Sequence, residues 1–424
     1  MEKVESFDLA HENERRSFSK SEEQLVLDRA NENEAEGLTV KRAVSLEGFV
    51  CLILFIVGVL GFSHIMGFVN FMNTAFSTAF SLLTDTVFYL MALSVVVGGL
   101  TQLLTEFGVV SLFNQLLSYI MRPIFGLPGI AAVGAVTTYF SDNPALLTLG
   151  NDQKFQRYFK KYQLPAMVNL ATGFGLGFIV TVFMIGVAPA GQSYIVPVLI
   201  GNVAAMGGSF ISTRLMLRQT RRLYGTEAMA VDESQLSNDS FDPLHGREAH
   251  TGSIFERGLS ALMEGGKKGV ETGVSIIPGV LIISTIVLML TFGPGQGGVY
   301  TGAANEGIAF LPWLGDKLSF VINPIFGFSD PGNISVPLTA LGAAGAAIGL
   351  VPNLVQQGLA NAHDIAVFTA MAMCLSGYLS THVAMMDSIG YPEATAPALK
   401  SHTIGALASG VIANLLYQLI TFIF

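Results

Sequence analysis

Charged residues are scarce in this sequence. Asp, Glu, Lys and Arg make up 12% of its 424 residues, about half of the share that is usual in soluble domains. Hydrophobic residues make up 51% and occur in long blocks. Because about 20 apolar residues suffice to cross a bilayer as a helix, the composition predicts a polytopic membrane protein. The net charge of -9 gives no support to nucleic-acid binding.

The sequence has only two cysteines and lacks the common catalytic motifs. Cys51 and Cys374 stand in separate apolar segments, so we expect neither a disulfide nor a CxxC metal site. The sequence has no HExxH motif, no GxSxG in a suitable setting and no P-loop. A membrane protease of the aspartyl type needs two apposed aspartates, for which Asp142 and Asp330 are the only candidates. We therefore predict that the chain is not an enzyme and has no metal site or cofactor other than a coupling ion.

The N-terminal region is polar. Residues 1–40 are rich in acidic side chains and are expected to form a disordered cytoplasmic tail. Two basic residues precede a first span at 43–68, so the positive-inside rule places the N-terminus in the cytoplasm. This extra span and an interfacial segment make up residues 41–85 of a multi-pass protein of the plasma (inner) membrane.

A first repeat is expected at 86–213. It opens with a span and continues with an amphipathic surface helix at 107–122. Residues 123–150 are apolar but lie between Arg122 and the basic run KFQRYFKKYQ, so both of their ends belong on the cytoplasmic side. A segment that starts and ends on one side must enter and turn back, which predicts a re-entrant hairpin. Two spans follow, and a polar cytoplasmic loop occupies 214–268.

Residues 269–424 repeat this order with a span, an interfacial helix, a second hairpin and two final spans. The letters PIFG occur at 123–126 and again at 324–327. Four letters can match by chance, but the shared order of elements supports a repeat. Flanking charges put the first copy inside and the second outside, so the repeats are inverted, which places a binding site at the midplane. The expected fold is therefore all-α and polytopic with inverted repeats, each a span, an interfacial helix, a re-entrant hairpin and two spans.

This order of elements resembles the concentrative nucleoside transporters. The stretch from TDTVFYLMAL to MRPIFGLPG resembles the nucleoside-recognition (gate) domain, which also occurs in ferrous-iron permeases and sporulation maturation membrane proteins. A second copy is similar from VETGVSIIPG to VINPIFG, so the resemblance covers about 86–424. It implies a nucleoside held by two hairpin tips and two unwound helices, sodium near the first tip, and a homotrimer. The gate cysteines of the iron permeases have no counterpart in the matching helices, so iron transport is not expected.

The first hairpin tip is expected in YFSDNPALLTLG. Asp142 and Asn143 interrupt an apolar stretch there, and a carboxylate at membrane depth marks an ion or proton path. We interpret the pair as a coordination point for a cation or a substrate ammonium group, with Thr138 and Ser141 beside it. The alternative is a surface turn that ends a helix before Pro144.

A glycine-rich break is expected in NLATGFGLGF, 169–178. Its three glycines within five residues weaken a helix, so that Asn169, Thr172 and the carbonyl group of Gly173 become available to a ligand. The alternative is that these glycines only allow close packing.

The partner segment in the second repeat is CLSGYLSTH, 374–382, in which Ser376, Ser380, Thr381 and His382 are the polar candidates. His382 has the alternative of a satisfied interior histidine.

The second tip is expected near TALGAAGAA, where Thr339 and Gly342 would let backbone amides face a ligand. Close helix packing is the alternative there. Asp330, in SDPGN, either caps the second hairpin or enters the site.

The sequence thus predicts a secondary active transporter of a small polar solute, coupled to Na+ or H+. A nucleoside is the first expectation, and an amino acid or short peptide the next; a gate-domain accessory protein that acts with a partner is the other class. Expected partners are membrane lipid, the small-molecule substrate and further copies of the chain. The substrate candidates are Thr138, Ser141, Asp142, Asn143, Asn169, Thr172, Thr339, Gly342, Ser376, Ser380, Thr381 and His382, and the ion-coupling candidates are Asp142, Asn143, Gly173 and Asp330.

Overall fold

The computed structural model describes residues 44–141, 153–231, 246, 249–376 and 378–423. Every regular element in these residues is a helix, and the only strand-like feature among them is a single bridge between Lys160 and Met229. The all-α prediction is therefore confirmed. Contacts divide the chain into two units, residues 1–61 and 62–424.

The described part of the first unit is most of one helix, α2 (Leu46–Met66). It has 21 residues, nearly all of them apolar. A helix that is apolar on all sides and about 20 residues long has the properties of a membrane span. A helix of spanning length is thus present where the span at 43–68 is expected, and the acidic tail lies outside the described residues.

The second unit begins with one long helix that changes its winding in the middle. α3 (Phe68–Ser81), the π-helical turn η1 (Leu82–Val87) and α4 (Phe88–Glu106) follow without a gap. The 39 residues measure about 58 Å at 1.5 Å per residue, roughly twice the hydrocarbon core of a bilayer. The length is sufficient for both the expected span and the interfacial segment before it.

The rest of the first half has helices where the surface helix, the first arm of the hairpin and the two spans are expected. The expected hairpin tip lies outside the described residues, and the helix expected as the next span is interrupted. The elements are α5 (Val109–Ile120), η2 (Met121–Phe125), α6 (Ala131–Phe140), α8 (Gln153–Gln156), α9 (Leu164–Thr172), α10 (Gly177–Gly186) and α11 (Ile195–Tyr224).

The second half has the same order. A long helix is followed by a surface helix, a hairpin, an interrupted helix and a final long helix. The elements are α12 (Ile254–Ser275), η4 (Gly279–Ser284), α13 (Thr285–Thr291), η5 (Gln296–Gly298), α14 (Phe310–Phe326), η6 (Pro331–Ile334), α15 (Ser335–Ala340), α16 (Ala344–Gln356), α17 (Ala362–Cys374), α18 (Tyr378–Ser388), η7 (Pro392–Ala394) and α19 (Thr395–Ile423).

The two PIFG copies adopt the same local structure. In each, a helix ends at the phenylalanine, and the glycine after it is left-handed, with φ of 77° at Gly126 and 66° at Gly327. Only glycine adopts this conformation without strain, so it terminates the surface helix cleanly in both halves.

The polar segment between the two halves has fewer non-helical residues than the expected loop at 214–268. The basic run after Thr213 continues α11 as far as Tyr224, and α12 already begins at Ile254. A capping box between Ser253 and Glu256 starts α12 and satisfies two backbone N–H groups reciprocally. Tertiary packing of α12 therefore turns residues that look like loop into helix.

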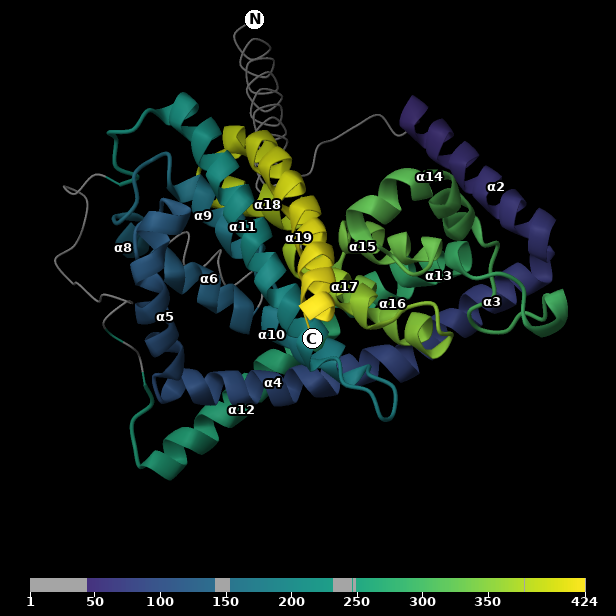
Figure 1. Ribbon diagram of the computed structural model, residues 1–424, viewed down its shortest axis with the longest axis horizontal. Helices are drawn as coiled ribbons and strands as arrows, with labels where there is room; N and C mark the ends of the chain where they lie inside the picture. The colour runs from purple at the N-terminus through teal and green to yellow at the C-terminus, as the bar shows by residue number, and fades with distance from the viewer. Residues whose placement is uncertain (1–43, 142–152, 232–245, 247–248, 377, 424) are drawn as a thin grey trace, which may run out of the picture. The chain divides into compact units, whose positions relative to one another are not determined.

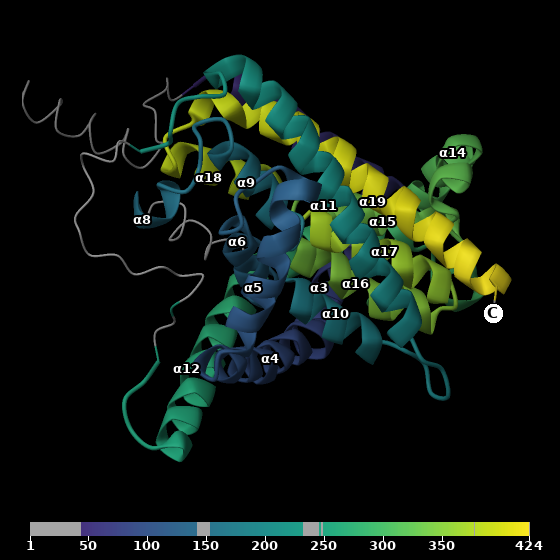
Figure 2. The same ribbon diagram turned by 60° about the vertical axis from the view of Figure 1, so that its left-hand side comes forward.

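Small residues bring two pairs of long helices into close contact, α4 with α12 and α11 with α19, as Figure 1 and Figure 2 both show. An added Cβ at Gly269 would lie 2.2 Å from the carbonyl oxygen of Ser94, and one at Gly405 would lie 2.5 Å from that of Gly208. Glycine is required at these crossings because the backbones touch, which is a common way for membrane helices to associate.

Six helices in the described residues are long and apolar enough to cross a membrane. They correspond to six of the expected spans, with α9 and α10 counted as one. The seventh, expected at 364–386, is represented by the short apolar helix α17 and by α18 beyond a break. The chain is a multi-pass membrane protein.

Candidate functional site

The glycine run after Thr172 interrupts the helix, as the sequence predicts. α9 ends at Thr172, α10 begins at Gly177, and Leu176 is left-handed with φ of 54°. A Cβ on Gly173 would lie 2.7 Å from the Cβ of Ser209. The glycine therefore has a packing role as well as a helix-breaking one, so both sequence interpretations apply to it.

The second half has its break at the corresponding place, where α17 ends at Cys374 and α18 begins at Tyr378. The two breaks lie against each other. The Cys374 thiol is 3.7 Å from the carbonyl oxygen of Gly173 and 3.6 Å from that of Ala205. Two interrupted helices that meet at their interruptions bring polar backbone groups together inside an apolar protein.

A chain of buried polar side chains runs beside the two breaks. The Asn169 amide donates to Ser212 Oγ at 3.0 Å and to the carbonyl oxygen of Ala398 at 3.1 Å. Ser212 Oγ is 3.2 Å from Nδ1 of His402, whose Nε2 is hydrogen-bonded to the Cys374 carbonyl group. This chain connects α9, α11, α17 and α19.

His382 extends this polar chain. Its ring centroid is 4.6 Å from that of His402, and its Nδ1 is 2.8 Å from the carbonyl oxygen of Tyr378. Its Nε2 and Oδ1 of Asn169 are buried and find no hydrogen-bond partner in the described part of the chain. Unpartnered buried polar atoms are costly, so they mark places where a ligand or water is expected. The interior-histidine interpretation therefore accounts for only one of the two ring nitrogens.

Near the end of the first hairpin helix, the Thr138 hydroxyl group is hydrogen-bonded to backbone carbonyl groups. It donates to the carbonyl oxygen of Ala171 at 2.9 Å and also lies 3.0 Å from that of Gly134. Thr172 similarly donates to the carbonyl oxygen of Val168 within its own helix. Ser141 is exposed at the end of α6, and Asp142 and Asn143 lie outside the described residues.

A polar cavity of about 290 Å³ lies next to this hairpin end. Thr137 and Ser141 of the hairpin line one side, together with Phe140. The long helices α4 and α12 provide most of the other polar lining, which is Ser94, Thr101, Gln102, Thr105, Lys268 and Thr272. The Thr101 hydroxyl is buried and has no hydrogen-bond partner in the described residues. The lining of the cavity therefore includes several hydroxyl groups that can form hydrogen bonds with a polar solute.

The sequence analysis missed most of this cavity. It named Thr138, whereas the neighbouring Thr137 faces the cavity, and it named nothing on α4 or α12. The sequence did contain a signal. Thr101 and Gln102 follow Ser94 by seven and eight residues, so the three side chains share one face of an otherwise apolar helix.

The two helices of the second hairpin pack against each other. α15 and α16 are joined by a turn at 341–343, near the expected tip. Thr339 donates to the carbonyl oxygen of Ser335 at 2.7 Å, and a Cβ on Gly342 would lie 3.3 Å from Ile283. Asp330 Oδ1 accepts from the Gly332 N–H at 2.7 Å, which caps η6. This contact agrees with the capping alternative for Asp330.

One buried acid of this half is Asp364, the first residue of the span expected at 364–386 and not among the predicted site residues. It is fully buried and accepts four hydrogen bonds. The donors are the N–H and hydroxyl groups of Ser329, the amide of Asn333 at 3.0 Å and the N–H of Asn361 at 2.9 Å. Hydrogen-bond donors can stabilise a buried carboxylate, so this cluster fixes the start of α17.

The structure brings Asn169, Gly173 and His382 into one region around the breaks. Thr339, Gly342 and Asp330 make their contacts within the second hairpin or with Ile283. Ser376 is buried in the second break, and the side chains of Ser380 and Thr381 are outside the description.

Comparisons with known proteins give structural matches alone. No protein family and no curated protein matches the chain. The chain is similar to a solved structure of CNTnw in an inward-facing substrate-bound state, with 15% identity, 80% of each chain covered and a TM-score of 0.47. It is also similar to a doubly substituted CNTnw in an outward-facing state, with 14% identity, 88% of this chain and 85% of that chain covered and a TM-score of 0.48. The function must therefore be argued from the residues of this chain.

Proposed function

We propose that the chain is a secondary active transporter of a small polar solute and that the cavity between the first hairpin and the helix pair α4–α12 is its solute site. The observation that carries the proposal is a cavity inside a membrane protein that is lined mainly by polar residues, which come from the end of the first hairpin helix and from α4 and α12. Polar groups inside a membrane protein are costly and line substrate or ion pathways by default.

The lining indicates the class of solute. Hydroxyl groups both donate and accept hydrogen bonds, which suits sugar hydroxyls, base edges or an amino-acid backbone. The Gln102 amide already bonds to Glu264 and Lys268, at 3.3 and 3.5 Å. The ammonium group of Lys268 is 2.8 Å from the Glu264 carboxylate, so its charge is already balanced. The volume of about 290 Å³ is at the lower end of ligand pockets. A nucleoside is the first candidate, and an amino acid or a short peptide the second.

Coupling to Na+ or H+ is assigned to the region where the hairpin and the breaks come together. Carbonyl groups at interrupted helices coordinate cations in transporters, and Gly173 lies in such an interruption. Asp142 and Asn143 follow directly after Ser141, which lines the cavity. Inverted repeats in a plasma membrane, with a cytoplasmic N-terminus, would expose the cavity alternately to the two sides.

Uptake into proteoliposomes tests the proposal. Purified protein is reconstituted and offered labelled uridine, leucine and a dipeptide, each with an inward sodium gradient, an inward proton gradient or no gradient. We expect one solute class to accumulate with one gradient and the Asp142→Ala variant to lose accumulation. If a well-folded sample transports none of them with either gradient, the proposal fails in this form, and the accessory-protein class takes its place.

A further inference from the structure

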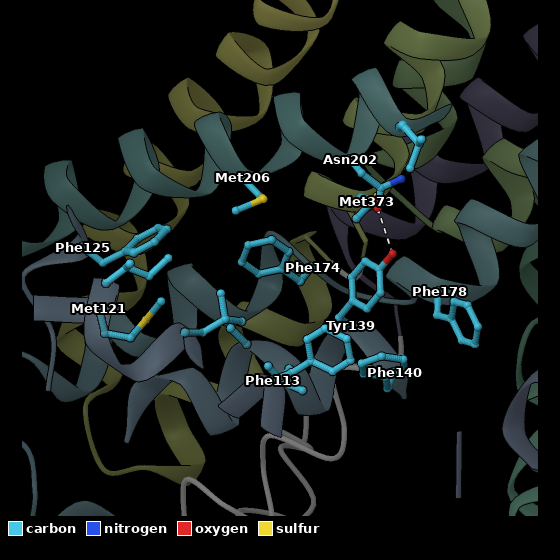
Figure 3. A pocket seen from close by; sticks show the side chains of 15 residues that line it. Phe113, Met121, Phe125, Tyr139, Phe140, Phe174, Phe178, Asn202, Met206 and Met373 are labelled. Carbon is cyan, nitrogen blue, oxygen red and sulfur yellow. Dashed lines mark hydrogen bonds between the residues drawn. The ribbon is translucent and has the colours of Figure 1, made fainter. Parts of the chain in front are cut away.

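A second hollow of about 440 Å³ lies on a different side of the first hairpin, between α5, α6 and α11. Figure 3 shows it lined by aromatic rings and methionines, with Met121 and Phe125 at one end and Tyr139 and Asn202 at the other. The Tyr139 hydroxyl donates to Asn202 Oδ1 at 3.0 Å. These two polar side chains satisfy each other, so an apolar occupant would leave neither of them without a partner.

This apolar hollow is open to the surroundings of the protein. Phe113 on α5 and Leu199 and Met206 on α11 line it and are 45%, 53% and 41% exposed. α11 is long and apolar enough to span the membrane, so its exposed Leu199 and Met206 face lipid chains. The hollow is therefore accessible from the bilayer.

A basic hollow continues along the same face of α11. Phe210, Arg214, Arg218 and Arg221 line it, spaced three or four residues apart, which places them on one side of the helix. Phe125 joins the two hollows, because its ring lies 6.1 Å from that of Phe210. A ligand with an apolar part and a charged part can therefore occupy both.

The arginines leave positive charge available. Arg214 donates to the carbonyl oxygens of Pro123 and Ile124 at 2.7 and 2.6 Å, and its guanidinium lies over the ring of Phe210. Arg221 lies over the ring of Tyr162. Within the described residues, no carboxylate pairs with Arg214, Arg218 or Arg221. Neutral partners hold two of these side chains but leave their charges uncompensated, and arginine binds phosphate well.

From these two hollows we infer a binding site for one anionic phospholipid, with an acyl chain in the apolar hollow and the phosphate at Arg218 and Arg221. The dimensions fit, because Met206 and Arg218 are twelve residues apart, about 18 Å along a helix. That distance is comparable with one leaflet's half of the roughly 30 Å hydrocarbon core. The site does not depend on whether the chain transports a solute.

Native mass spectrometry of the full-length protein, titrated with phosphatidylglycerol or phosphatidylcholine of identical chains, tests this inference. We expect tighter binding of phosphatidylglycerol. Arg218→Gln and Arg221→Gln should each weaken it about fivefold, with phosphatidylcholine unaffected. Arg222→Gln is the matched control, because this exposed arginine lies one position away and does not line the basic hollow. Equal losses for Arg222→Gln and Arg218→Gln would show general surface attraction and overturn the site.

The apolar hollow needs its own variants. Met206→Trp should fill it and weaken both lipids, whereas Val203→Trp, at an exposed α11 position that does not line it, should weaken neither. Displacement of phosphatidylglycerol by excess glycerol phosphate would show that the headgroup alone is bound. Loss of oligomers rather than of lipid in Met206→Trp would show that a second copy of the chain covers this face. Either result would contradict the inference.

Discussion

The two halves of the chain share an order of elements but use their polar residues differently. In the first half, Thr101, Thr137 and Ser141 line a cavity that α12 of the second half closes on one side. In the second half, Asp364, the most deeply buried acid, is surrounded by four donors on Ser329, Asn333 and Asn361. The same architecture thus supports a site on one side and a hydrogen-bonded anchor on the other. Substitutions of these residues should therefore lower stability in the second half and weaken solute binding in the first half.

The largest effect is expected at the anchor. Asp364→Asn replaces one acceptor oxygen by an NH2 group that faces existing donors, so we expect a loss of about 3 kcal/mol in the free energy of unfolding. Thermal unfolding of the purified protein measures it. The exposed Asp316→Asn on α14 is the control and should change little. A variant as stable as the control would show that Asp364 does not anchor this half.

The segment between η5 and α14 in the second half contains another buried carboxylate. Burial by itself raises the pKa of Glu306, but hydrogen bonds from Thr301 and from the N–H groups of Gly302 and Ala303 outweigh it and hold the pKa below its usual value. A lowered folded-state pKa contributes stability above the unfolded pKa, about 4.3 to 4.5, and this stability is lost as the pH falls through the folded pKa. Glu306→Gln should therefore cost about 2 kcal/mol at pH 7.

Melting temperatures of wild type and Glu306→Gln between pH 7 and pH 3 check this prediction. The difference between them should shrink as the pH falls. Exposed Glu271→Gln serves as the control. A difference that stays constant down to pH 3 would contradict an ionised Glu306.

A matched pair of variants separates the two halves by function. Thr101→Val and Thr285→Val each remove a buried hydroxyl group that has no hydrogen-bond partner in the described residues, so neither should lower the melting temperature. Only Thr101 lines the cavity. We expect solute uptake to fall about tenfold in Thr101→Val, the loss of one hydrogen bond of about 1.4 kcal/mol, and to stay unchanged in Thr285→Val. Equal uptake in both variants would show that Thr101 is not part of the solute site.

The smallest effect is expected at Asp330. Asp330→Ala removes the side-chain acceptor that caps η6, so we expect a loss of about 1 kcal/mol in stability. The ion dependence of uptake should not change, because the carboxylate is engaged in the cap. Altered ion dependence with unchanged stability would instead give Asp330 a coupling role.

Local signals in the sequence were sufficient for much of the fold. Gly126 and Gly327 each end a surface helix, and the glycines after Thr172 interrupt α9, because backbone conformation at these places depends on the residue itself. The start of α12 was not foreseen, because residues 254–268 become helical against α4. Tertiary packing also decides which face of a helix meets a cavity, so Thr137 was missed for Thr138. Asp364 was missed because its donors come from segments up to 35 residues away.

The most direct test is whether a small polar solute binds at the first-half cavity. A thermal-shift screen would offer nucleosides, nucleobases, amino acids and dipeptides, each with sodium or potassium and at two pH values, to wild type, Thr101→Val and Thr285→Val. A ligand that binds the folded protein raises its melting temperature by mass action. The account predicts a shift from one solute class in wild type and Thr285→Val that is much reduced in Thr101→Val. A shift of the same size in all three proteins would contradict the assignment of the cavity as the solute site.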